Sequence, residues 1–471
     1  MLLVAGLLLA EAPPAAADPW YRPQPMLGVI DAGRQLQAAH AVGATWDRVV
    51  FLWQEIQPYN PTDWYLDRYL DRTGLRTVLQ KSDLPLVAVV QGTPGWAAGN
   101  WHDGAAAIPT GLDYPVDDPH NFFALFMQRL AQTYRGRISA WIIWNEPDFR
   151  PGEAVDSLTW GGNTADFFSL VRAGYRAVKK VDRNAAVVFP ATTYFADAVS
   201  GRNLFLDRVL QEGRRDPDAA RNGYYFDAVA VNLYCSLDAI YRVRGLYADV
   251  LARYGLSAKP VWLTETNCPI YNDARAPVQP QAHITTMEQA SFLIQAIALA
   301  RAAGYDRVGW YSMVDAASNS SIGERWGLLR ADGSPRPAYR ALLTAGRYLA
   351  DASLTARLAP LGEADRDGYP VTRVIVDDPQ RARRVQVLWR TRLGPRSVAV
   401  EASGSSARVL DMSGYGPPAM RSAGGWEVPL PPPRVPQSFD PPGFQSGGDP
   451  VLLVESEVRA GAAATPRLAA R

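Results

Sequence analysis

Short apolar, β-branched runs alternate with amphipathic segments along most of the chain, and this alternation predicts its main fold. Segments with a helical period of hydrophobic positions, such as 121–130 and 292–300, separate runs that have the length of buried strands. The runs are 27–30, 45–51, 85–90, 138–143, 186–189, 228–233, 261–264 and 307–311. Repeated strand-then-helix units predict an α/β fold, a (β/α)8 TIM barrel, whose usual size of about 250 residues fits this span once loops are added.

A doubly wound parallel sheet is the competing fold for such an alternation. That fold binds phosphates with a glycine-rich turn directly after its first strand. Here the first run is followed by Asp-Ala-Gly-Arg at 31–34, which has a single glycine. The barrel is therefore favoured.

The pattern changes after residue 350, where period-two alternation replaces the helical pattern. The alternating runs are 371–376, 384–389, 397–400, 407–410 and 451–454. Such runs, with turn residues between them, predict a smaller C-terminal β-sandwich. The expected organisation is an export signal at 1–17, the barrel at 18–349, the sandwich at 350–458 and a disordered tail at 459–471.

The first residues are typical of a secretory signal. An apolar block at 1–10 precedes a small-residue Ala-Ala-Ala site at 15–17, and the block is too short to span a membrane. A basic segment before the block is missing, since the first arginine is Arg22. The signal is thus either atypical or truncated, and we expect an exported protein without a membrane span.

Charge and composition exclude several classes of partner. The formal charge is +1, from 48 basic and 47 acidic residues, so there is no electrostatic reason to bind nucleic acid or an anionic membrane. The four histidines show no ligand spacing, and we expect neither a metal nor another cofactor. Cys235 and Cys268 each follow a predicted strand, and the sequence leaves open whether they pair.

Two glutamates carry the candidate chemistry. Glu146 lies in the string Trp-Asn-Glu-Pro at 144–147, and Glu265 lies in Trp-Leu-Thr-Glu-Thr-Asn at 262–267. Each comes at the end of a predicted buried strand, and the active site of a parallel α/β protein lies at the carboxyl ends of its strands. Cleavage of a glycosidic bond needs such a pair, one carboxyl to protonate the leaving oxygen and one to attack or assist at the sugar carbon.

Around these strings the chain resembles the clan A glycoside hydrolases over most of residues 27–345. Within that clan, the segments 91–97 and 226–234 and the trailing β-domain are most similar to family 39, which holds β-xylosidases, iduronidases and exopolysaccharide hydrolases. The resemblance implies that Glu146 is the acid/base and Glu265 the nucleophile of a retaining mechanism. It also implies that Asn145 holds the sugar 2-hydroxyl, that Tyr234 donates to the nucleophile and that Trp310 stacks on a sugar.

Further substrate-binding candidates come from the ends of other predicted strands. Arg48 is a possible cationic neighbour of the nucleophile, with a structural ion pair to Asp47 or another carboxylate as the alternative. Gln91 is placed to bond a hydroxyl. Asn232 stands where clan relatives often carry histidine; an asparagine donates a hydrogen bond but does not titrate. Trp53 and Trp96 are further stacking candidates, with burial in the rim or core as the alternative.

The sequence thus predicts a secreted retaining glycoside hydrolase that cleaves β-glycosidic bonds of oligo- or polysaccharides. A transglycosylase with the same residues and a catalytically silent carbohydrate-binding barrel are the alternatives. The sugar, exo or endo action, the role of the sandwich and the oligomeric state stay open.

Overall fold

The computed structural model describes residues 26–99, 101–149, 159–270, 284–315, 325–362, 370–391, 393–434, 444 and 447–458. The predicted export signal at 1–17 and the predicted tail at 459–471 lie outside these residues.

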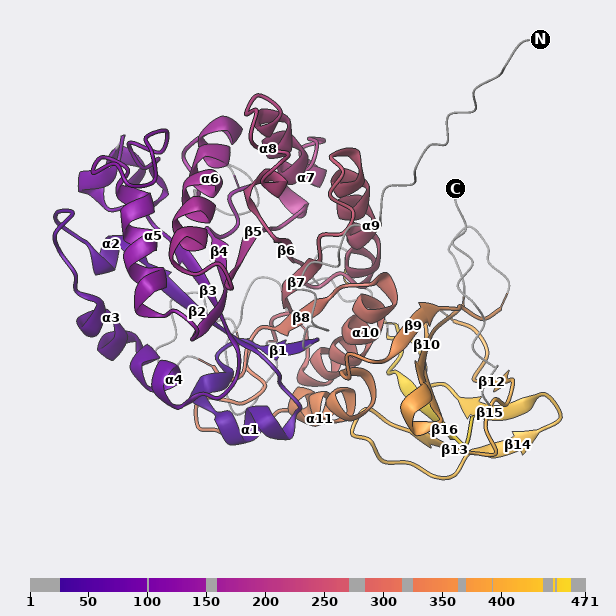
Figure 1. Ribbon diagram of the computed structural model, residues 1–471. Coiled ribbons are helices and arrows are strands. Elements are labelled where there is room, and N and C mark those ends of the chain that lie inside the picture. The colour runs from indigo at the N-terminus through magenta and orange to yellow at the C-terminus, as the bar shows by residue number, and fades with distance from the viewer. Residues whose placement is uncertain are drawn as a thin grey trace, which may run out of the picture.

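An 8-stranded parallel sheet with the order β1-β8-β7-β6-β5-β4-β3-β2 forms the centre of the larger domain (Figure 1). A parallel bridge between Gly28 and Trp46 joins the two end strands and closes the barrel. The strands are β1 (Leu27–Val29), β2 (Asp47–Leu52), β3 (Leu86–Gln91), β4 (Ile138–Ile143), β5 (Ala186–Thr192), β6 (Ala228–Asn232), β7 (Val261–Thr266) and β8 (Arg307–Trp310). Each overlaps a predicted run, and the predicted fold class is confirmed.

The barrel interior is packed around a tryptophan. Trp46 is completely buried there, and two glycines make room for its ring. A Cβ on Gly28 would lie 2.1 Å from the indole, and one on Gly309 would lie 2.8 Å from it. Neither position therefore accepts a larger residue without moving Trp46. The other buried members of this interior cluster are Ile30, Val87, Val89, Ala140, Ile142, Val188, Ala191, Ala228, Ala230 and Trp262.

Helices surround the barrel and bury an apolar face against it (Figure 1). Several begin at a side chain that accepts a backbone N–H, namely Asn121 before α5, Asn163 before α6, Ser236 before α9 and Thr285 before α10. The α-helices are α1 (Leu36–Ala41), α2 (Trp53–Ile56), α3 (Leu66–Thr73), α4 (Leu75–Lys81), α5 (Phe122–Thr133), α6 (Thr164–Val181), α7 (Phe195–Val199), α8 (Phe205–Gly213), α9 (Leu237–Arg253), α10 (Thr286–Ala303) and α11 (Pro337–Leu349). Short 3-10 helices are η1 (Ala32–Arg34), η2 (Gly95–Ala97), η3 (Trp101–Ala106), η4 (Gly223–Tyr225) and η5 (Pro379–Arg381).

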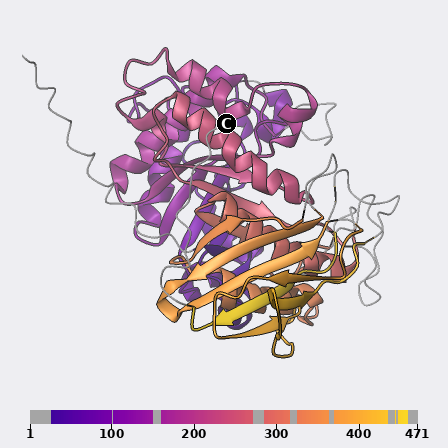
Figure 2. The same ribbon diagram turned by 90° about the vertical axis from the view of Figure 1, so that its right-hand side faces the viewer.

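The C-terminal part is a sandwich of two antiparallel sheets, as the alternating runs predicted (Figure 2). One sheet contains β13 (Ser406–Leu410), β16 (Val451–Ser456), β11 (Arg383–Arg390), β10 (Val371–Asp378) and β9 (Thr355–Leu358). The other contains β12 (Ser397–Val400), β15 (Gly425–Pro429) and β14 (Met420–Ser422). The sequence pattern missed β9 and β14, which are short and have no buried face, and it also missed β15, a short strand whose Trp426 and Val428 face the sandwich core.

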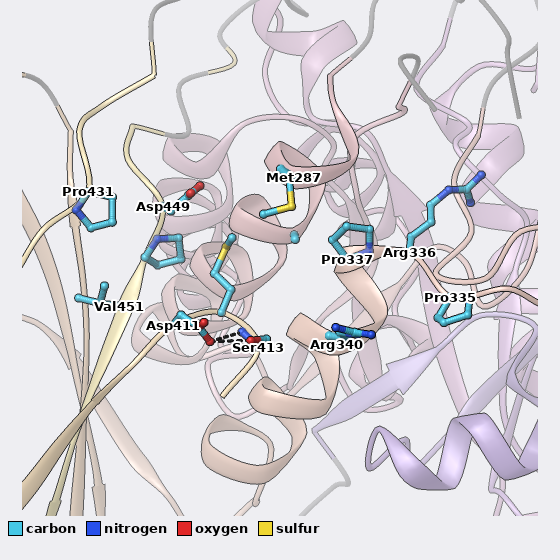
Figure 3. A pocket seen from close by; sticks show the side chains of 13 residues that line it. Met287, Pro335, Arg336, Pro337, Arg340, Asp411, Ser413, Pro431, Asp449 and Val451 are labelled. Atoms are coloured by element: carbon cyan, nitrogen blue, oxygen red, sulfur yellow. Dashed lines mark hydrogen bonds between the residues drawn. The ribbon is translucent and has the colours of Figure 1, made fainter. Parts of the chain in front are cut away.

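Helix α10 joins the two domains, because barrel and sandwich cover it on opposite sides. Ser291 donates a hydrogen bond to Asp449, and Gln295 donates one to the carbonyl of Gly448 at 3.1 Å. A pocket of about 580 Å³ lies beside this contact. Figure 3 shows Met287 on one side of this pocket and Pro431 on the other.

Candidate active site

The turn after β4 presents Glu146 at the carboxyl end of the barrel. Trp144 and Glu146 both have left-handed backbone angles, with φ of 80° and 47°. This uncommon geometry is held by a hydrogen bond from the Glu146 amide to the carbonyl of Ala191 at 2.8 Å and by the hydroxyl of Thr159, which donates to the Glu146 carbonyl. The side chain of Glu146 lies at the mouth, where its Oε1 accepts a hydrogen bond from Asn232.

A β-bulge near the end of β7 turns Glu265 into the same mouth. Leu263 pairs with Val231, but the next pair is Glu265 with Asn232, so β7 has one extra residue at this point. Trp262 faces the barrel interior, and regular alternation would place Glu265 on the outer face. The bulge reverses the alternation. The glutamate is consequently within strand β7, whereas the sequence placed it directly after the strand.

Both oxygens of Glu265 have a donor. Arg48 forms an ion pair with Oε1, and the hydroxyl of Tyr234 donates to Oε2. Glu265 is only 7% exposed, so this pair is shielded from water. Burial works against the charge of Arg48, but the Glu265 carboxylate raises the pKa of Arg48 above its usual value. The predicted contacts of Arg48 and Tyr234 with Glu265 are therefore present.

The alternative partner for Arg48, Asp47, is engaged elsewhere. Asp47 accepts hydrogen bonds from the amide of Gly33 at 2.7 Å and from the amide of Arg48 at 2.6 Å. Burial of this carboxyl raises its pKa to about 7. Asp47 thus fixes the start of β2, while the side chain of Arg48 is free to reach Glu265.

Glu146 has a different electrostatic environment from Glu265. Burial, followed by the nearby charge of Glu265, raises the pKa of Glu146 to about 8. The amide of Asn232 partly opposes this, because its Nδ2 donates to Glu146 Oε1 at 2.7 Å. One carboxyl of the pair is thus protonated at neutral pH, while the other faces a cation.

Asn145 and Gln91 lie where the sequence placed them, at the ends of β4 and β3. The Oδ1 atom of Asn145 is buried, and no described residue hydrogen-bonds it. Gln91 follows Val87 and Val89, which face the barrel interior, so it stands on the same face one step nearer the mouth. Both positions suit contact with a hydroxyl group of a ligand in the mouth.

The stacking role expected for Trp310 is wrong, and so is that for Trp53. Trp310 is 0% exposed and packs outside the barrel wall, with its ring 6.4 Å from that of Phe292. Trp53 is also 0% exposed and stacks on Phe126 at 5.4 Å. Trp96 is half-buried and donates from Nε1 to a backbone carbonyl at 2.7 Å.

Two aromatic residues that the sequence reasoning did not single out lie beside Tyr234 instead. Tyr311 directly follows β8 with its ring 6.4 Å from Tyr234, and Trp326 lies 5.1 Å from Tyr234. Both are partly exposed. The neighbouring charges of Glu265 and Arg48 act on Tyr311, whose pKa rises to about 12 mainly through burial. Period-two alternation starting from Gly309 would have identified Tyr311, but no local signal in the sequence points to Trp326.

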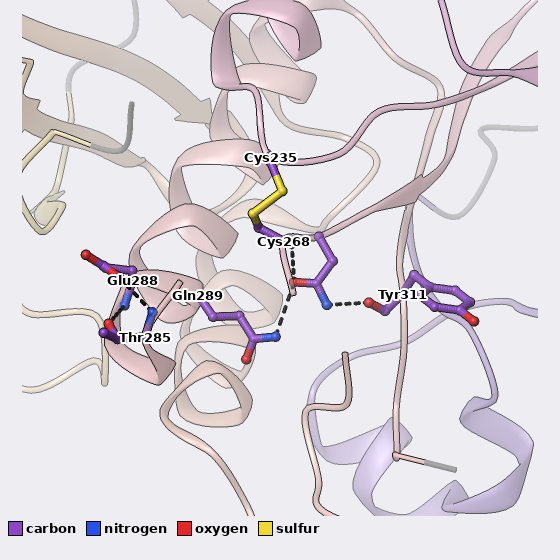
Figure 4. The surroundings of a disulfide bond; sticks show 7 residues. Cys235, Cys268, Thr285, Glu288, Gln289 and Tyr311 are labelled. Atoms are coloured by element: carbon purple, nitrogen blue, oxygen red, sulfur yellow. Dashed lines mark hydrogen bonds between the residues drawn. A yellow bond between two sulfur atoms is a disulfide. The ribbon is translucent and has the colours of Figure 1, made fainter. Parts of the chain in front are cut away.

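A disulfide between Cys235 and Cys268 joins the segments that follow β6 and β7, which settles the pairing that the sequence left open (Figure 4). Next to it, the side chain of Asn267 donates to the carbonyls of Tyr311 and Trp326 and accepts a bond from Gln289 at 3.2 Å. These links tie the strand ends that carry Tyr234, Glu265 and the aromatic pair.

Within the part of the chain that the structure describes, no group of His, Cys, Asp and Glu side chains is placed to hold a metal ion. No described helix is both long and apolar enough to cross a membrane.

Comparison with solved structures supports the fold. The chain is similar to a family 39 glycoside hydrolase from Bacteroides cellulosilyticus, with 15% identity, a TM-score of 0.64, and coverage of 91% of this chain and 80% of the other. It is also similar to the catalytic domain of GH30 xylanase C from Talaromyces cellulolyticus, with 12% identity, a TM-score of 0.54, and coverage of 92% of this chain and 96% of the other. A third similar structure is a monomeric β-xylosidase from Caulobacter crescentus, with 14% identity, a TM-score of 0.53, and coverage of 91% of this chain and 95% of the other. No family model and no curated protein matches the sequence.

Proposed function

We propose that the protein is a secreted, retaining glycoside hydrolase that cleaves β-glycosidic bonds in oligo- or polysaccharides. The observation that carries this proposal is the unequal pair of carboxyls in one barrel mouth. Glu146 is poised to give a proton, because its pKa is raised to about 8. Glu265 is poised to attack, because Arg48 and Tyr234 orient both of its oxygens.

In the first step, an oxygen of Glu265 attacks the anomeric carbon while Glu146 protonates the leaving oxygen. The bond from the sugar to the leaving group breaks, the aglycone departs as an alcohol, and a glycosyl ester forms on Glu265. In the second step, Glu146 takes a proton from water, whose oxygen attacks the anomeric carbon and displaces Glu265. Glu146 ends protonated, and two inversions retain the configuration.

The contacts of Asn232 support retention. Asn232 is the register partner of Glu265 on the adjacent strand, and its side chain hydrogen-bonds Glu146, so both glutamates are neighbours of one residue. Retaining enzymes hold their carboxyls about 5–5.5 Å apart, whereas inverting enzymes need about 6.5–9.5 Å to admit a water molecule. Their common neighbour and the effect of the Glu265 charge on Glu146 favour the shorter separation.

The substrate contacts follow from the groups around the carboxyls. Tyr311 and Trp326 offer aromatic faces for a sugar ring, in place of the buried Trp310. Among the described residues none hydrogen-bonds the buried Oδ1 of Asn145, which suits a contact with the sugar 2-hydroxyl that becomes stronger in the transition state. Gln91 is placed to bond another hydroxyl.

The function is tested with a panel of aryl β-glycosides and polysaccharides. Glu146→Ala should slow substrates with poor leaving groups far more than activated aryl glycosides, which need little acid assistance. Glu265→Ala should abolish turnover of both, and azide should restore part of it with a product of inverted configuration. Glu212→Ala on α8, away from the mouth, is the matched control and should behave like the parent.

Each rival function predicts a different result. A transglycosylase would give longer or transferred glycosides as main products in the same assay. A silent carbohydrate-binding barrel would bind glycosides without turning over any of them. Parental activity in both glutamate variants would refute the assignment of the carboxyls.

Export is the remaining element of the proposal. The disulfide supports it, because such bonds persist in oxidising compartments outside the cytosol. Expression of the full chain in a bacterial host, followed by fractionation and N-terminal sequencing, should recover protein outside the cytosol with its N-terminal segment removed. Recovery of the intact chain only from the cytosol would contradict export.

A further inference from the structure

Two consecutive hydrogen bonds connect the body of the barrel to the proton-bearing Glu146. The hydroxyl of Thr264 on β7 donates to Asn232 Oδ1 at 2.9 Å, and Asn232 Nδ2 donates to Glu146 Oε1 at 2.7 Å. Thr264 is 0% exposed and Asn232 is 1% exposed, so water does not compete for these groups. The pair of bonds comes from two adjacent strands, β6 and β7.

The orientation of the Asn232 amide is the decisive feature of this chain. The only other acceptor near the Thr264 hydroxyl among the described residues is the carbonyl of Val231, at the longer distance of 3.4 Å. The hydroxyl therefore favours Oδ1, which directs the NH₂ group of Asn232 to Glu146. A flipped amide would instead place an acceptor against Glu146 and draw the acid proton away from the mouth.

We propose that Thr264 and Asn232 are positioning residues that reserve Oε1 of Glu146 as an acceptor and so confine its proton to Oε2, the oxygen available to the leaving group. This inference rests on the proposed function and assigns to two side chains outside the reacting pair the task of orienting the acid. Because Asn232 does not titrate, it performs this task in both protonation states of Glu146, as acid catalysis and the subsequent base catalysis require.

Other charged and titratable groups also act on Glu146 and must stay constant in a test. They come from the elements around the mouth and are Glu265, Asp148, Arg48, Tyr234 and Tyr311. The test therefore changes only Asn232 and Thr264. Removal of a donor that stabilises the carboxylate raises the pKa of Glu146, so the loss of activity at high pH moves to still higher pH.

The experiment compares the parent with Asn232→Ala, Asn232→Asp and Thr264→Val. It measures kcat/KM against pH for one activated and one poorly activated aryl glycoside. For both Asn232 variants we expect the basic limb to move up by about one pH unit, and the poorly activated substrate to slow by at least about tenfold relative to the activated one. Thr264→Val should show smaller changes in the same direction, because it removes only the hydrogen bond that orients the Asn232 amide and leaves the amide itself in place.

Matched controls separate positioning from stability. Asn121→Ala removes another buried asparagine, the cap of α5, and Thr344→Val removes another buried hydroxyl, on α11. Both should leave the pH limb and the leaving-group dependence unchanged, even where they lower stability. Titration of ¹³C-labelled glutamate carboxyls, with the Glu146 signal assigned by Glu146→Gln, reads the same shift without turnover.

The outcomes distinguish this inference from the proposed function. An active parent whose Asn232 variants keep the parental pH limb and leaving-group dependence would refute the positioning role and leave the hydrolase intact. A parent that hydrolyses no glycoside would refute the proposed function. The carboxyl titration alone would then test whether the hydrogen bonds from Thr264 through Asn232 act on Glu146. A higher pKa of the Glu146 signal in Asn232→Ala supports the positioning role of Asn232, and an unchanged pKa refutes it.

Discussion

Replacement of Glu146 by glutamine should stabilise the fold, and more strongly as the pH rises. Glutamine keeps the size of the side chain and an oxygen that accepts from Asn232, but it cannot ionise. In the parent, Glu146 has an ordinary pKa in the unfolded chain and a raised one in the folded protein. The stability that its protonated form contributes is complete below the unfolded value and is lost as the pH rises to the folded value.

The size of the effect follows from the two pKa values. The pKa is 4.5 for the ordinary carboxyl and about 8 for Glu146 in the folded protein, where burial and the charge of Glu265 raise it. At about 1.36 kcal/mol per unit, the parent should lose about 4 kcal/mol of unfolding free energy between pH 5 and pH 8 through this group. The difference between Glu146→Gln and the parent should therefore grow by about that amount over the same interval.

Urea unfolding of both proteins at pH 5, 6, 7 and 8 measures this difference. Groups that the two proteins share cancel in the comparison, and Glu212→Gln on α8 controls for the chemical change itself. A difference that is constant across the interval would refute the reasoning, because Glu146 would then titrate alike in the folded and unfolded chain.

Three further predictions concern the surroundings of the carboxyls. Tyr234→Phe removes one hydrogen bond to a charged group, so kcat in steady-state assays should fall about 10- to 100-fold with little change in KM; an unchanged kcat would exclude the contact from the mechanism. Trp326→Ala should raise KM several-fold in the same assays. Trp310→Ala should instead lower the free energy of unfolding by about 3–5 kcal/mol in denaturation curves. The reverse pattern would identify Trp310 as the residue that stacks on the sugar. Reduction of the Cys235–Cys268 bond, which closes a separation of 33 residues, should cost about 3–4 kcal/mol in denaturation with dithiothreitol, and an equal stability of both forms would contradict this.

The strands and the reacting pair could be predicted because their signals are local. Buried parallel strands are continuous apolar runs, and polar residues at their carboxyl ends meet at one mouth whatever the loops do. The strand positions of Glu146 and Glu265 therefore predicted one shared mouth, although it is the bulge in β7 that turns the side chain of Glu265 into it. The contact between Arg48 and Glu265 was one of two open alternatives, and the burial of Asp47 against Gly33 decided between them.

The stacking residues could not be predicted in the same way. Whether a strand-end tryptophan faces the mouth or the helices depends on a single step of the alternation, and a bulge changes that step. Trp310 falls on the outer face and Tyr311 on the inner one. Trp326 approaches Tyr234 from a segment more distant in sequence, which only the folded chain brings near.

The central claim is that Glu265 attacks the sugar and that water then hydrolyses the glycosyl ester. Trapping this intermediate tests the claim most directly. The substrate is an activated 2-deoxy-2-fluoro β-glycoside of the sugar that the protein hydrolyses best, and peptide mass spectrometry locates the adduct. The account predicts one glycosyl group on the peptide that contains Glu265. An adduct on Glu146, or efficient turnover to an inverted product without any adduct, would contradict it.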